Sequence, residues 1–266
     1  MTTWPVKKSL LGVDISVANY DEVVASVAAA AENHTPAVAS FFAVHPVVLA
    51  SRDAELRRMV NSFELIGPDG QPVRWGLNLL HRAGLRHRVY GPQAMLRICR
   101  EAERRGHDIY LYGGTETTLS KLCDRLTEKF PSLRIAGAEA PPFKPFSADD
   151  HVAAAKRISQ TGADIVFIGL GAPKQDLCAA AMRDHFAGPI VCVGAAFDFH
   201  AEVKKMAPAW MQRRGLEWLY RLYQEPRRLA HRYATTNSLF LCLLLRDWFA
   251  HRLRRSASPP PGEPQP

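Results

Sequence analysis

Residues 163–176 have the sequence ADIVFIGLGAPKQD, which contains the clearest signal of local structure in the chain. Residues 165–168 are β-branched or aromatic and end at a glycine, as is typical of a strand buried on both faces. Gly169 and Gly171 allow a tight turn, and Pro173 suits the first position of a helix. The segment therefore predicts a strand, a turn and a helix.

The same turn is suited to bind an anion. Its glycines let the backbone approach a ligand, and the free N–H groups of the following helix, together with Lys174, favour phosphate oxygens. The spacing differs from the G-x-G-x-x-G fingerprint, so a dinucleotide site is not predicted. From this stretch alone, an ordinary strand-to-helix turn remains the alternative.

Short apolar runs alternate with longer helical patterns on both sides of this segment. Strands are expected at residues 12–17, 38–44, 63–66, 108–112, 134–138, 164–168 and 189–193. Helices are expected at residues 21–31, 93–105, 117–130, 148–159 and 175–186. The alternation predicts an α/β, Rossmann-like fold with a mainly parallel sheet and helices on both faces.

The charge distribution divides the chain. Residues 203–255 hold 12 of the 34 lysines and arginines but only 3 of the 26 acidic residues, whereas residues 1–202 are balanced. We expect an α/β domain at 1–202, a basic helical C-terminal appendage at 203–255 and a disordered proline-rich tail at 256–266. Basic helices are expected at 208–223, 226–233 and 236–254. Such an appendage favours an acidic partner: nucleic acid, an anionic membrane or a phosphorylated lipid.

Composition and targeting signals favour a cytoplasmic protein. The five cysteines form no C-x-x-C pair, which is typical of reduced thiols. The first residues lack the apolar segment of a signal peptide. The longest apolar run, residues 239–245, is far shorter than the ~20 residues of a membrane-spanning helix.

In an open α/β sheet, ligands bind beyond the carboxyl ends of the strands, so the residues after each predicted strand are candidates. Asp69 is the best candidate for a general base, although Pro-Asp-Gly is also a common turn sequence. Gly113 and Gly114 offer a second phosphate site or a simple turn. Asp198 is suited to hold a ribose or a base, or to cap a helix.

The sequence contains no metal-binding pattern. His45 is expected near the site, without a second ligand at metal spacing, and no D-x-D motif is present. Helix N-termini, lysine and arginine would therefore neutralise a diphosphate. No metal and no cofactor are expected.

Several further motifs occur in a fixed order over roughly residues 10–240. They are PDG at 68–70, RVYG at 88–91, YLYGG at 110–114, GLGAPKQD at 169–176, AAFDFHA at 195–201, APAWM at 207–211 and GLEWLYRLYQEPRRLAHRY at 215–233. Together they resemble the bacterial WecG/TagA/CpsF glycosyltransferase family, glycosyltransferase family 26.

The resemblance implies an inverting, metal-independent enzyme of surface polysaccharide synthesis at the inner face of the cytoplasmic membrane. It would move a hexose, often N-acetylmannosamine or its uronic acid, from a UDP-sugar to a saccharide linked to polyprenyl diphosphate. Asp69 matches the catalytic base. The UDP-sugar region corresponds to His45, Gly113, Gly114, Gly171, Lys174, Gln175 and Asp198. The diphosphate and acceptor region corresponds to Arg88, Arg221, Arg227 and Arg232.

The chain departs from the family pattern at several positions. Ala43-Val44-His45 replaces the usual Thr-x-Asn. Gln93 replaces Asp, Asp176 replaces Glu, Glu202 replaces Gly and Met206 replaces Arg. The donor hexose is therefore not predicted from the family, and a catalytically diminished member is one alternative.

The C-terminal segment allows more than one interpretation. Residues 239–245, followed by aromatic residues and arginines, favour an interfacial helix on the membrane. Alternatively, the leucine face packs on the body or on a second subunit of a homo-oligomer. The aromatic residues among the arginines also suit a basic nucleotide- or nucleic-acid-binding module without transferase activity: Trp218, Tyr220, Tyr223 and Tyr233. The enzyme is our leading hypothesis, and it needs no nucleic acid partner.

Overall fold

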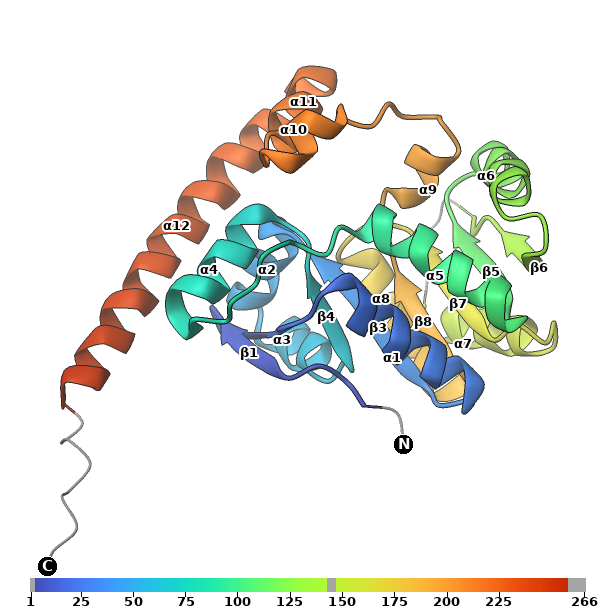
Figure 1. The fold of residues 1–266 in the computed structure, drawn as a ribbon, viewed down its shortest axis with the longest axis horizontal. Coiled ribbons are helices and arrows are strands. Elements are labelled where there is room, and N and C mark those ends of the chain that lie inside the picture. Colours follow the sequence, from blue (N-terminus) through green and yellow to red (C-terminus); the bar gives the residue numbers. More distant parts are fainter. Residues whose placement is uncertain (1–2, 143–146, 258–266) are drawn as a thin grey trace, which may run out of the picture.

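The computed structural model describes residues 3–142 and 147–257. These residues form a six-stranded parallel sheet in the order β4-β3-β8-β7-β5-β6 (Figure 1). Its strands are β3 (Ala37–Phe42), β4 (Leu65–Pro68), β5 (Asp108–Gly113), β6 (Arg134–Glu139), β7 (Ile165–Gly169) and β8 (Pro189–Cys192). The predicted α/β architecture with a mainly parallel sheet is confirmed.

Helices connect the strands and cover the sheet. In the first part of the chain they are α1 (Tyr20–Glu32), α2 (Val44–Arg52), α3 (Ala54–Asn61), α4 (Gln71–His81), α5 (Gly91–Arg105) and α6 (Glu116–Lys129). The later ones are α7 (Ala148–Ser159), α8 (Lys174–Met182), the short 3-10 helix η1 (Arg183–His185), α9 (Ala196–His200), α10 (Ala209–Arg213), α11 (Glu217–Gln224) and α12 (Pro226–Ala257).

Alternate residues of the strands feed two separate hydrophobic cores. In β3, Val38 and Phe42 belong to one core and Ala39 and Phe41 to the other, because neighbouring side chains on a strand point to opposite faces. The first core also contains residues of α2, α4, α7, α8 and α12. The second contains residues of α1, α5, α6 and α9. The inner strands β3, β5, β7 and β8 are largely buried because helices cover both faces, whereas the edge strand β6 is partly exposed.

Local signals account for several helix ends. Ser147 and Asp150 form the expected capping box of α7, and Thr115 caps α6. Gly106 ends α5 in a left-handed conformation, as its position in the sequence predicts. Helix α8 begins at Lys174, so Pro173 precedes the helix instead of opening it.

The N-terminal region differs from our expectation. The strand expected at residues 12–17 is β2 (Val13–Ser16), which pairs antiparallel with β1 (Lys7–Leu10) in a separate two-stranded sheet. Its turn residues Leu11 and Gly12 both have positive φ, which suits a two-residue hairpin. The run expected as a strand at 38–44 ends at Phe42, and α2 begins at Val44. Helices α2, α3 and α4 were not expected.

The C-terminal segment also differs in detail. The helix expected at 208–223 is divided into α10 and α11, because Gly215 has a φ of 72° after the end of α10. The two helices expected at 226–233 and 236–254 are the single helix α12. Phe240 and Leu244 of α12 are buried in the core beside α2 and α4. A Cβ at Gly76 of α4 would lie 2.9 Å from Leu10 of β1 and 3.4 Å from Leu244, so this glycine mainly permits the close packing of β1 on α4. The last nine residues of the tail expected at 256–266 lie outside the described residues.

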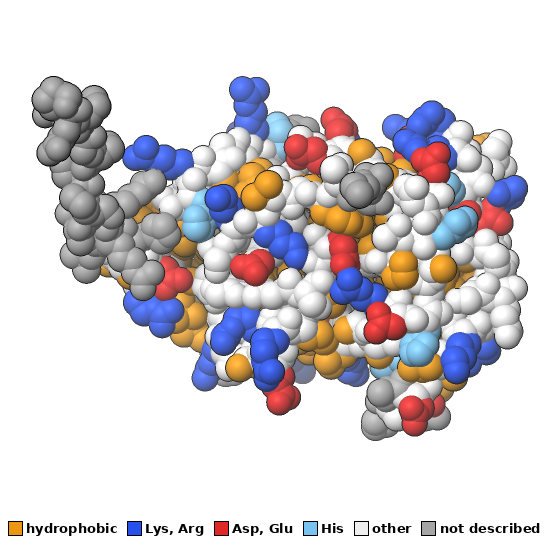
Figure 2. Space-filling model, turned by 90° about the horizontal axis from the view of Figure 1, so that it is seen from below, with side chains coloured by type: hydrophobic (Ala, Val, Ile, Leu, Met, Phe, Trp, Pro, Cys, Tyr) orange, Lys and Arg blue, Asp and Glu red, His pale blue; other side chains and the backbone are white. Residues whose placement is uncertain are grey.

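The surface of the molecule carries a mixture of charged and apolar side chains. On the face shown in Figure 2, basic side chains are interspersed with acidic ones and with apolar patches, and they do not form one continuous strip. Within the described part of the chain, no helix is long and apolar enough to cross a membrane. Among the described side chains of α12, the most exposed large apolar ones are Leu241, Leu245 and Phe249.

Gly113 at the end of β5 is required by close packing. Its φ is 131°, and an added Cβ would lie 2.8 Å from the carbonyl carbon of Gly169 on the neighbouring strand. Gly162 also has a positive φ, 77°, but a Cβ there would meet nothing within 4 Å. Alanine substitutions at the two positions therefore distinguish the free-energy cost of overpacking from that of backbone strain.

We predict that Gly113→Ala lowers the free energy of unfolding by about 3 kcal/mol, because overpacking adds to backbone strain. Gly162→Ala should cost only about 1 kcal/mol, from backbone strain alone. Urea denaturation of the two variants and the wild type measures both values. Equal losses in the two variants would contradict the packing argument.

Candidate active site

Two adjoining cavities lie at the carboxyl end of the sheet. The strand-end cavity is lined by residues that follow β3, β7 and β8, including Gly171, Lys174, Gln175, Gly194 and Asp198. The appendage cavity lies between the body and helices α11 and α12, with Gln71, Arg88, Glu217, Trp218 and Asn237 in its lining. Both are lined by Ala43, His45, Asp69, Tyr90 and Arg221. Asp69 therefore lies where the two cavities meet.

The turn between β7 and α8 is held by its own hydrogen bonds. The Gly171 N–H donates to the side-chain oxygen of Gln175 at 3.1 Å, and the Gln175 N–H donates to the Gly171 carbonyl at 2.9 Å. Gly171 has a φ of 76°, a conformation that favours glycine. This turn places the start of α8 and Lys174 at the strand-end cavity.

Asp176, which follows Gln175 in α8, connects the start of this helix to β3 and was not among the predicted site residues. Its carboxylate accepts a hydrogen bond of 2.8 Å from the Ser40 hydroxyl of β3. Both side chains are buried, and burial raises the pKa of the Asp176 carboxyl to about 7. The sequence signal was a serine within the apolar run of β3, which requires a buried partner.

Asp69 follows β4, and its N–H donates to the Phe42 carbonyl of β3 at 3.1 Å. Its Oδ1 lies 3.7 Å from Nη1 of Arg88, and its side chain is 18% exposed. Burial raises the pKa of the Asp69 carboxyl to about 6, although the nearby Arg88 acts in the opposite direction. At neutral pH this group is an unprotonated carboxylate with raised basicity.

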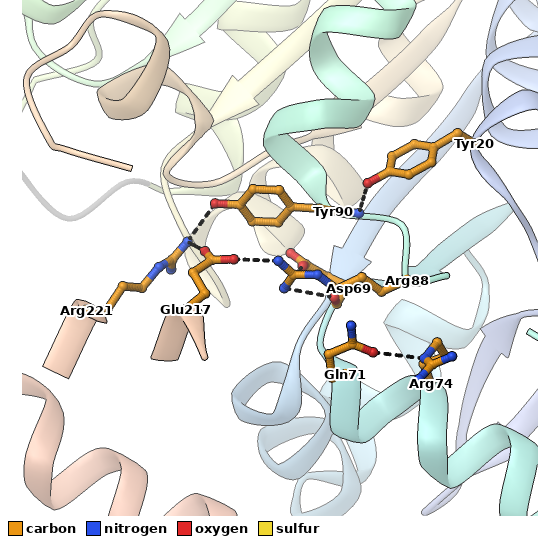
Figure 3. A network of polar contacts seen from close by, with 8 residues as sticks. All are labelled: Tyr20, Asp69, Gln71, Arg74, Arg88, Tyr90, Glu217 and Arg221. Carbon is orange, nitrogen blue, oxygen red and sulfur yellow. Dashed lines mark hydrogen bonds and ion pairs between the residues drawn. The ribbon is translucent and has the colours of Figure 1, made fainter. Parts of the chain in front are cut away.

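A network of charged side chains joins Asp69 to the appendage (Figure 3). Nη2 of Arg88 donates to Oε2 of Glu217 at 2.5 Å. Nη2 of Arg221 donates to Oε1 of Glu217 at 2.8 Å and to the Tyr90 hydroxyl at 3.3 Å. The Arg88 guanidinium lies 4.5 Å from the centre of the Tyr90 ring. Glu217, which was not predicted as a site residue, is the centre of this network.

The other predicted residues lie in different places. Asp198 lines the strand-end cavity and forms an ion pair of 2.8 Å with Lys204. Gly113 and Gly114 pack near Gly169 and Phe197 and line neither cavity. Their role in binding a UDP-sugar stays a prediction.

Two of the predicted arginines are not placed at the cavities. Arg227 is exposed on α12 and is absent from the lining of both. The side chain of Arg232 lies outside the described residues. Arg88 and Arg221, in contrast, lie together beside Glu217. Among the described residues, no cluster of three or more His, Cys, Asp or Glu side chains has the arrangement of a metal site.

Two departures from the family pattern have a structural correlate. Glu202 has a φ of 54°, a conformation that favours the glycine usual at this position. Ala43 and His45, which replace Thr and Asn, line both cavities beside Asp69. These two side chains therefore lie where a substrate would contact them.

We predict that Asp69 lowers the stability of the protein when it is ionised. Its folded pKa of about 6 is higher than the ordinary value of 3.8, so the folded state loses stability as pH rises through this window. The free energy of unfolding of Asp69→Asn minus that of the wild type should therefore rise by about 2 kcal/mol from pH 4 to pH 8. Urea denaturation at both pH values measures this change, with Asp124→Asn as an exposed control. An Asp69→Asn difference that is the same at both pH values would contradict the prediction.

Comparisons with known proteins identify the family of the chain. Residues 8–254 match the model of the glycosyl transferase WecG/TagA/CpsF family. The chain is also similar to a Bacillus subtilis (strain 168) protein named N-acetylglucosaminyldiphosphoundecaprenol N-acetyl-beta-D-mannosaminyltransferase. The two are 28% identical over 178 residues, which are 66% of this chain and 67% of the relative. With a match over nearly its whole length, the chain belongs to the WecG/TagA/CpsF family of glycosyltransferases.

Proposed function

We propose that this protein transfers a hexose of the N-acetylmannosamine type from a UDP-sugar to a saccharide linked to polyprenyl diphosphate. The transfer inverts the anomeric centre and needs no metal ion. The position of Asp69 at the junction of two cavities is the observation that carries the proposal. A transferase must bring two substrates together at one base, and two cavities that share a carboxylate meet this need.

The strand-end cavity suits the UDP-sugar. The N-terminus of α8 and Lys174 face it, and Lys204 and Arg221 add positive charge to its lining. Cationic side chains stabilise phosphate oxygens, and the positive end of the α8 helix dipole acts in the same direction. Asp198, at the end of the same cavity, offers a carboxylate for ribose hydroxyls. We propose that Gly113 and Gly114 act indirectly, because Gly113 packs against the backbone of Gly169, which lines this cavity.

The appendage cavity suits the acceptor. It is lined by the body residues Gln71 and Arg88 and by Trp218 and Asn237 of the appendage. An aromatic ring beside polar side chains is a common way to hold a sugar ring through its apolar face and its hydroxyls. Trp218 is 46% exposed and contacts Tyr233 edge to face, with ring centres 6.2 Å apart.

The chemistry follows from these positions. Asp69 removes the proton from the acceptor hydroxyl while that oxygen attacks the anomeric carbon of the donor. The bond between the anomeric carbon and the phosphate oxygen breaks on the opposite side, which inverts the configuration. The departing UDP carries the negative charge, and Lys174 and Arg221 stabilise it in the strand-end cavity. Because cationic side chains neutralise the diphosphate, a metal ion is not required.

The identity of the hexose rests on the relative and not on the cavity. The Bacillus subtilis protein is named as an N-acetyl-beta-D-mannosaminyltransferase that acts on N-acetylglucosaminyldiphosphoundecaprenol. In this chain His45 and Ala43 lie beside Asp69, so the contacts to the donor sugar differ from the usual family pattern. A donor screen should therefore include other UDP-hexoses.

We predict UDP release when the protein is incubated with UDP-N-acetylmannosamine and a polyprenyl-diphosphate-linked N-acetylglucosamine, in the presence of EDTA. Asp69→Asn should lower kcat by about 10²- to 10⁴-fold, because the general base is lost. The wild-type rate should fall as pH decreases through about 6, where Asp69 takes up a proton.

Binding titrations with UDP, GDP and ADP provide a test that needs no acceptor. Preference for UDP that is unchanged by EDTA supports the proposal, and Asp124→Asn serves as the exposed control in both assays. A rate that requires added Mg²⁺, or full activity of Asp69→Asn, would sink the mechanism. Absence of binding to any nucleotide would remove the donor assignment.

Helix α12 supports a location at the membrane surface. Leu241, Leu245 and Phe249 are each more than half exposed and follow one another at intervals of four residues, so they share one face. Arg246 and Arg252 lie on the same helix and are exposed. An exposed apolar stripe with arginines is typical of a helix that lies in a lipid interface. The acceptor, a lipid-linked saccharide, would be reached from this surface.

We predict that replacing Leu241, Leu245 and Phe249 together by Gln weakens binding to anionic vesicles at least tenfold. Each side chain would lose about 1 kcal/mol or more of apolar transfer free energy. Vesicle cosedimentation measures the change, and Val6→Gln, at an exposed apolar residue far from α12 in the sequence, is the control. Deletion of the segment is a poorer test because Phe240 and Leu244 belong to the core. Unchanged cosedimentation of the triple variant would contradict a membrane role for this face.

A further inference from the structure

Glu217 binds two arginines that come from different parts of the chain. Its Oε2 accepts from Arg88, which lies between α4 and α5 in the body, and its Oε1 accepts from Arg221, one turn further along α11 (Figure 3). Only 6% of Glu217 is exposed. Gly215, just before α11, lies so close to Gln71 of α4 that an added Cβ would be 2.8 Å from its Cγ. The start of α11 therefore packs directly on the body.

Arg88 lies between two carboxylates and binds them unequally. Its Nη2 is 2.5 Å from Glu217, whereas its Nη1 is 3.7 Å from the nearest oxygen of the Asp69 carboxylate. Nη1 instead donates to the backbone carbonyl of Asp69 at 3.4 Å. The direct charge-assisted hydrogen bond of Arg88 is therefore made to Glu217 and not to the Asp69 side chain.

We propose that Glu217 is a positioning residue that draws the Arg88 guanidinium away from Asp69 and so keeps the Asp69 carboxylate available as a base. The proposal rests on the proposed function, in which Asp69 accepts the proton of the acceptor hydroxyl. Glu217 does not touch the reacting atoms in this mechanism. It acts through Arg88.

The physical reason is competition for one cation. An arginine paired directly with a carboxylate lowers the pKa of that carboxylate by roughly 1 to 3 units, which makes it a poor base. In this site burial raises the pKa of Asp69 to about 6, Arg88 lowers it, Glu217 raises it and Arg221 lowers it. Arg88, Glu217 and Arg221 act on the pKa of Asp69, and the Asp69 charge in turn raises the pKa of Tyr20 and Tyr90. The other charged or titratable side chains that line the cavities around Asp69 include His45 and Lys174.

Glu217 is suited to this role because it stays ionised. Burial disfavours its charge, but Arg221 and Arg88 more than compensate, so its pKa is lowered from the ordinary value. It therefore retains its negative charge across the pH range in which Asp69 titrates. The competition for Arg88 is consequently present whenever α11 is docked on the body.

The experiment is a carbon NMR titration of the full chain with ¹³Cγ-labelled aspartate. The Asp69 resonance is assigned by its absence from Asp69→Asn. In the wild type we expect it to titrate near pH 6. In Glu217→Gln, Arg88 is free to pair with Asp69, and the midpoint should fall by about one pH unit or more. An unchanged midpoint would overturn the proposal.

A second pair of variants tests whether Arg88 carries the effect. If Glu217 acts through Arg88, replacing Glu217 by Gln in an Arg88→Met background should change the midpoint much less than in the wild-type background. The double variant removes one positive and one negative charge together, so it leaves no additional uncompensated buried charge and is expected to fold even where Glu217→Gln alone does not. A fall of the same size in both backgrounds would show that Arg88 is not involved and would overturn the proposal.

Glu101→Gln is the matched control. Glu101 also binds two arginines, Arg104 and Arg105, each at 2.6 Å, but it lies on α5 and lines neither cavity. Its loss should leave the Asp69 midpoint unchanged, and a shift would show that the effect is not specific to Glu217.

The NMR readout uses no substrate, so it remains valid if the transfer assay fails. Where transfer is observed, the acid limb of the pH profile of kcat should move to lower pH in Glu217→Gln, and the plateau rate should fall. A lowered plateau with an unmoved acid limb would point to a purely structural role and contradict the proposal.

Discussion

A parallel sheet that is covered by helices on both faces offers no open face to a ligand, and the rest of this molecule depends on that constraint. The strands β3 and β8 are buried along their whole length, so their polar backbone groups are paired within the sheet. We therefore expect the chemistry at the carboxyl ends of the strands, where Asp69 follows β4 and where His45, Gln175 and Asp198 lie near the starts of helices. The helix N-termini point toward the same end, which is why we propose that the phosphate-binding groups and the base lie together there.

The appendage closes this end because it shares the core of the body. Phe240 and Leu244 of α12 are buried against the helices of the body, and this apolar anchor holds α11 over the strand ends. Hydrophobic burial is not directional, so it holds the appendage against the body without fixing its exact orientation. The ion pair of Glu217 with Arg88 fixes the orientation of α11 on the body, and the ion pair with Arg221 holds Glu217 in place, since charge-assisted hydrogen bonds depend on geometry.

The sequence predicted the sheet well because its signals are local. The apolar run of β7, the glycines of the following turn and the capping box of α7 each depend on neighbouring residues only. The start of helix α2 was missed because apolar residues 38–44 form a continuous run in the sequence, although the strand ends at Phe42. The strand β1 was missed because Lys7 and Lys8 give it a polar sequence, while its pairing partner β2 provides the hydrogen bonds.

The site was predicted only in part, for a related reason. Asp69, Lys174 and Gln175 follow strands, so topology alone brings them together. Glu217 and Asp176 act through partners that are distant in sequence: Arg88 lies 129 residues from Glu217, and Ser40 lies 136 residues from Asp176. In the sequence alone, a glutamate among the arginines of a predicted basic helix has the features of an ordinary surface residue. Only the fold brings Arg88 beside it.

Charge balance explains why these partners must come as a set. Asp69, Arg88, Glu217 and Arg221 alternate in sign, and their formal charges cancel. Burying two opposite charges is tolerated when each has a partner, but loss of one partner leaves an uncompensated charge that costs about 3 to 5 kcal/mol. The appendage contributes one acid and one base to this set, so its own contribution is neutral. It can therefore dock over Asp69 without adding net charge to the site, while its glutamate still changes which carboxylate Arg88 binds.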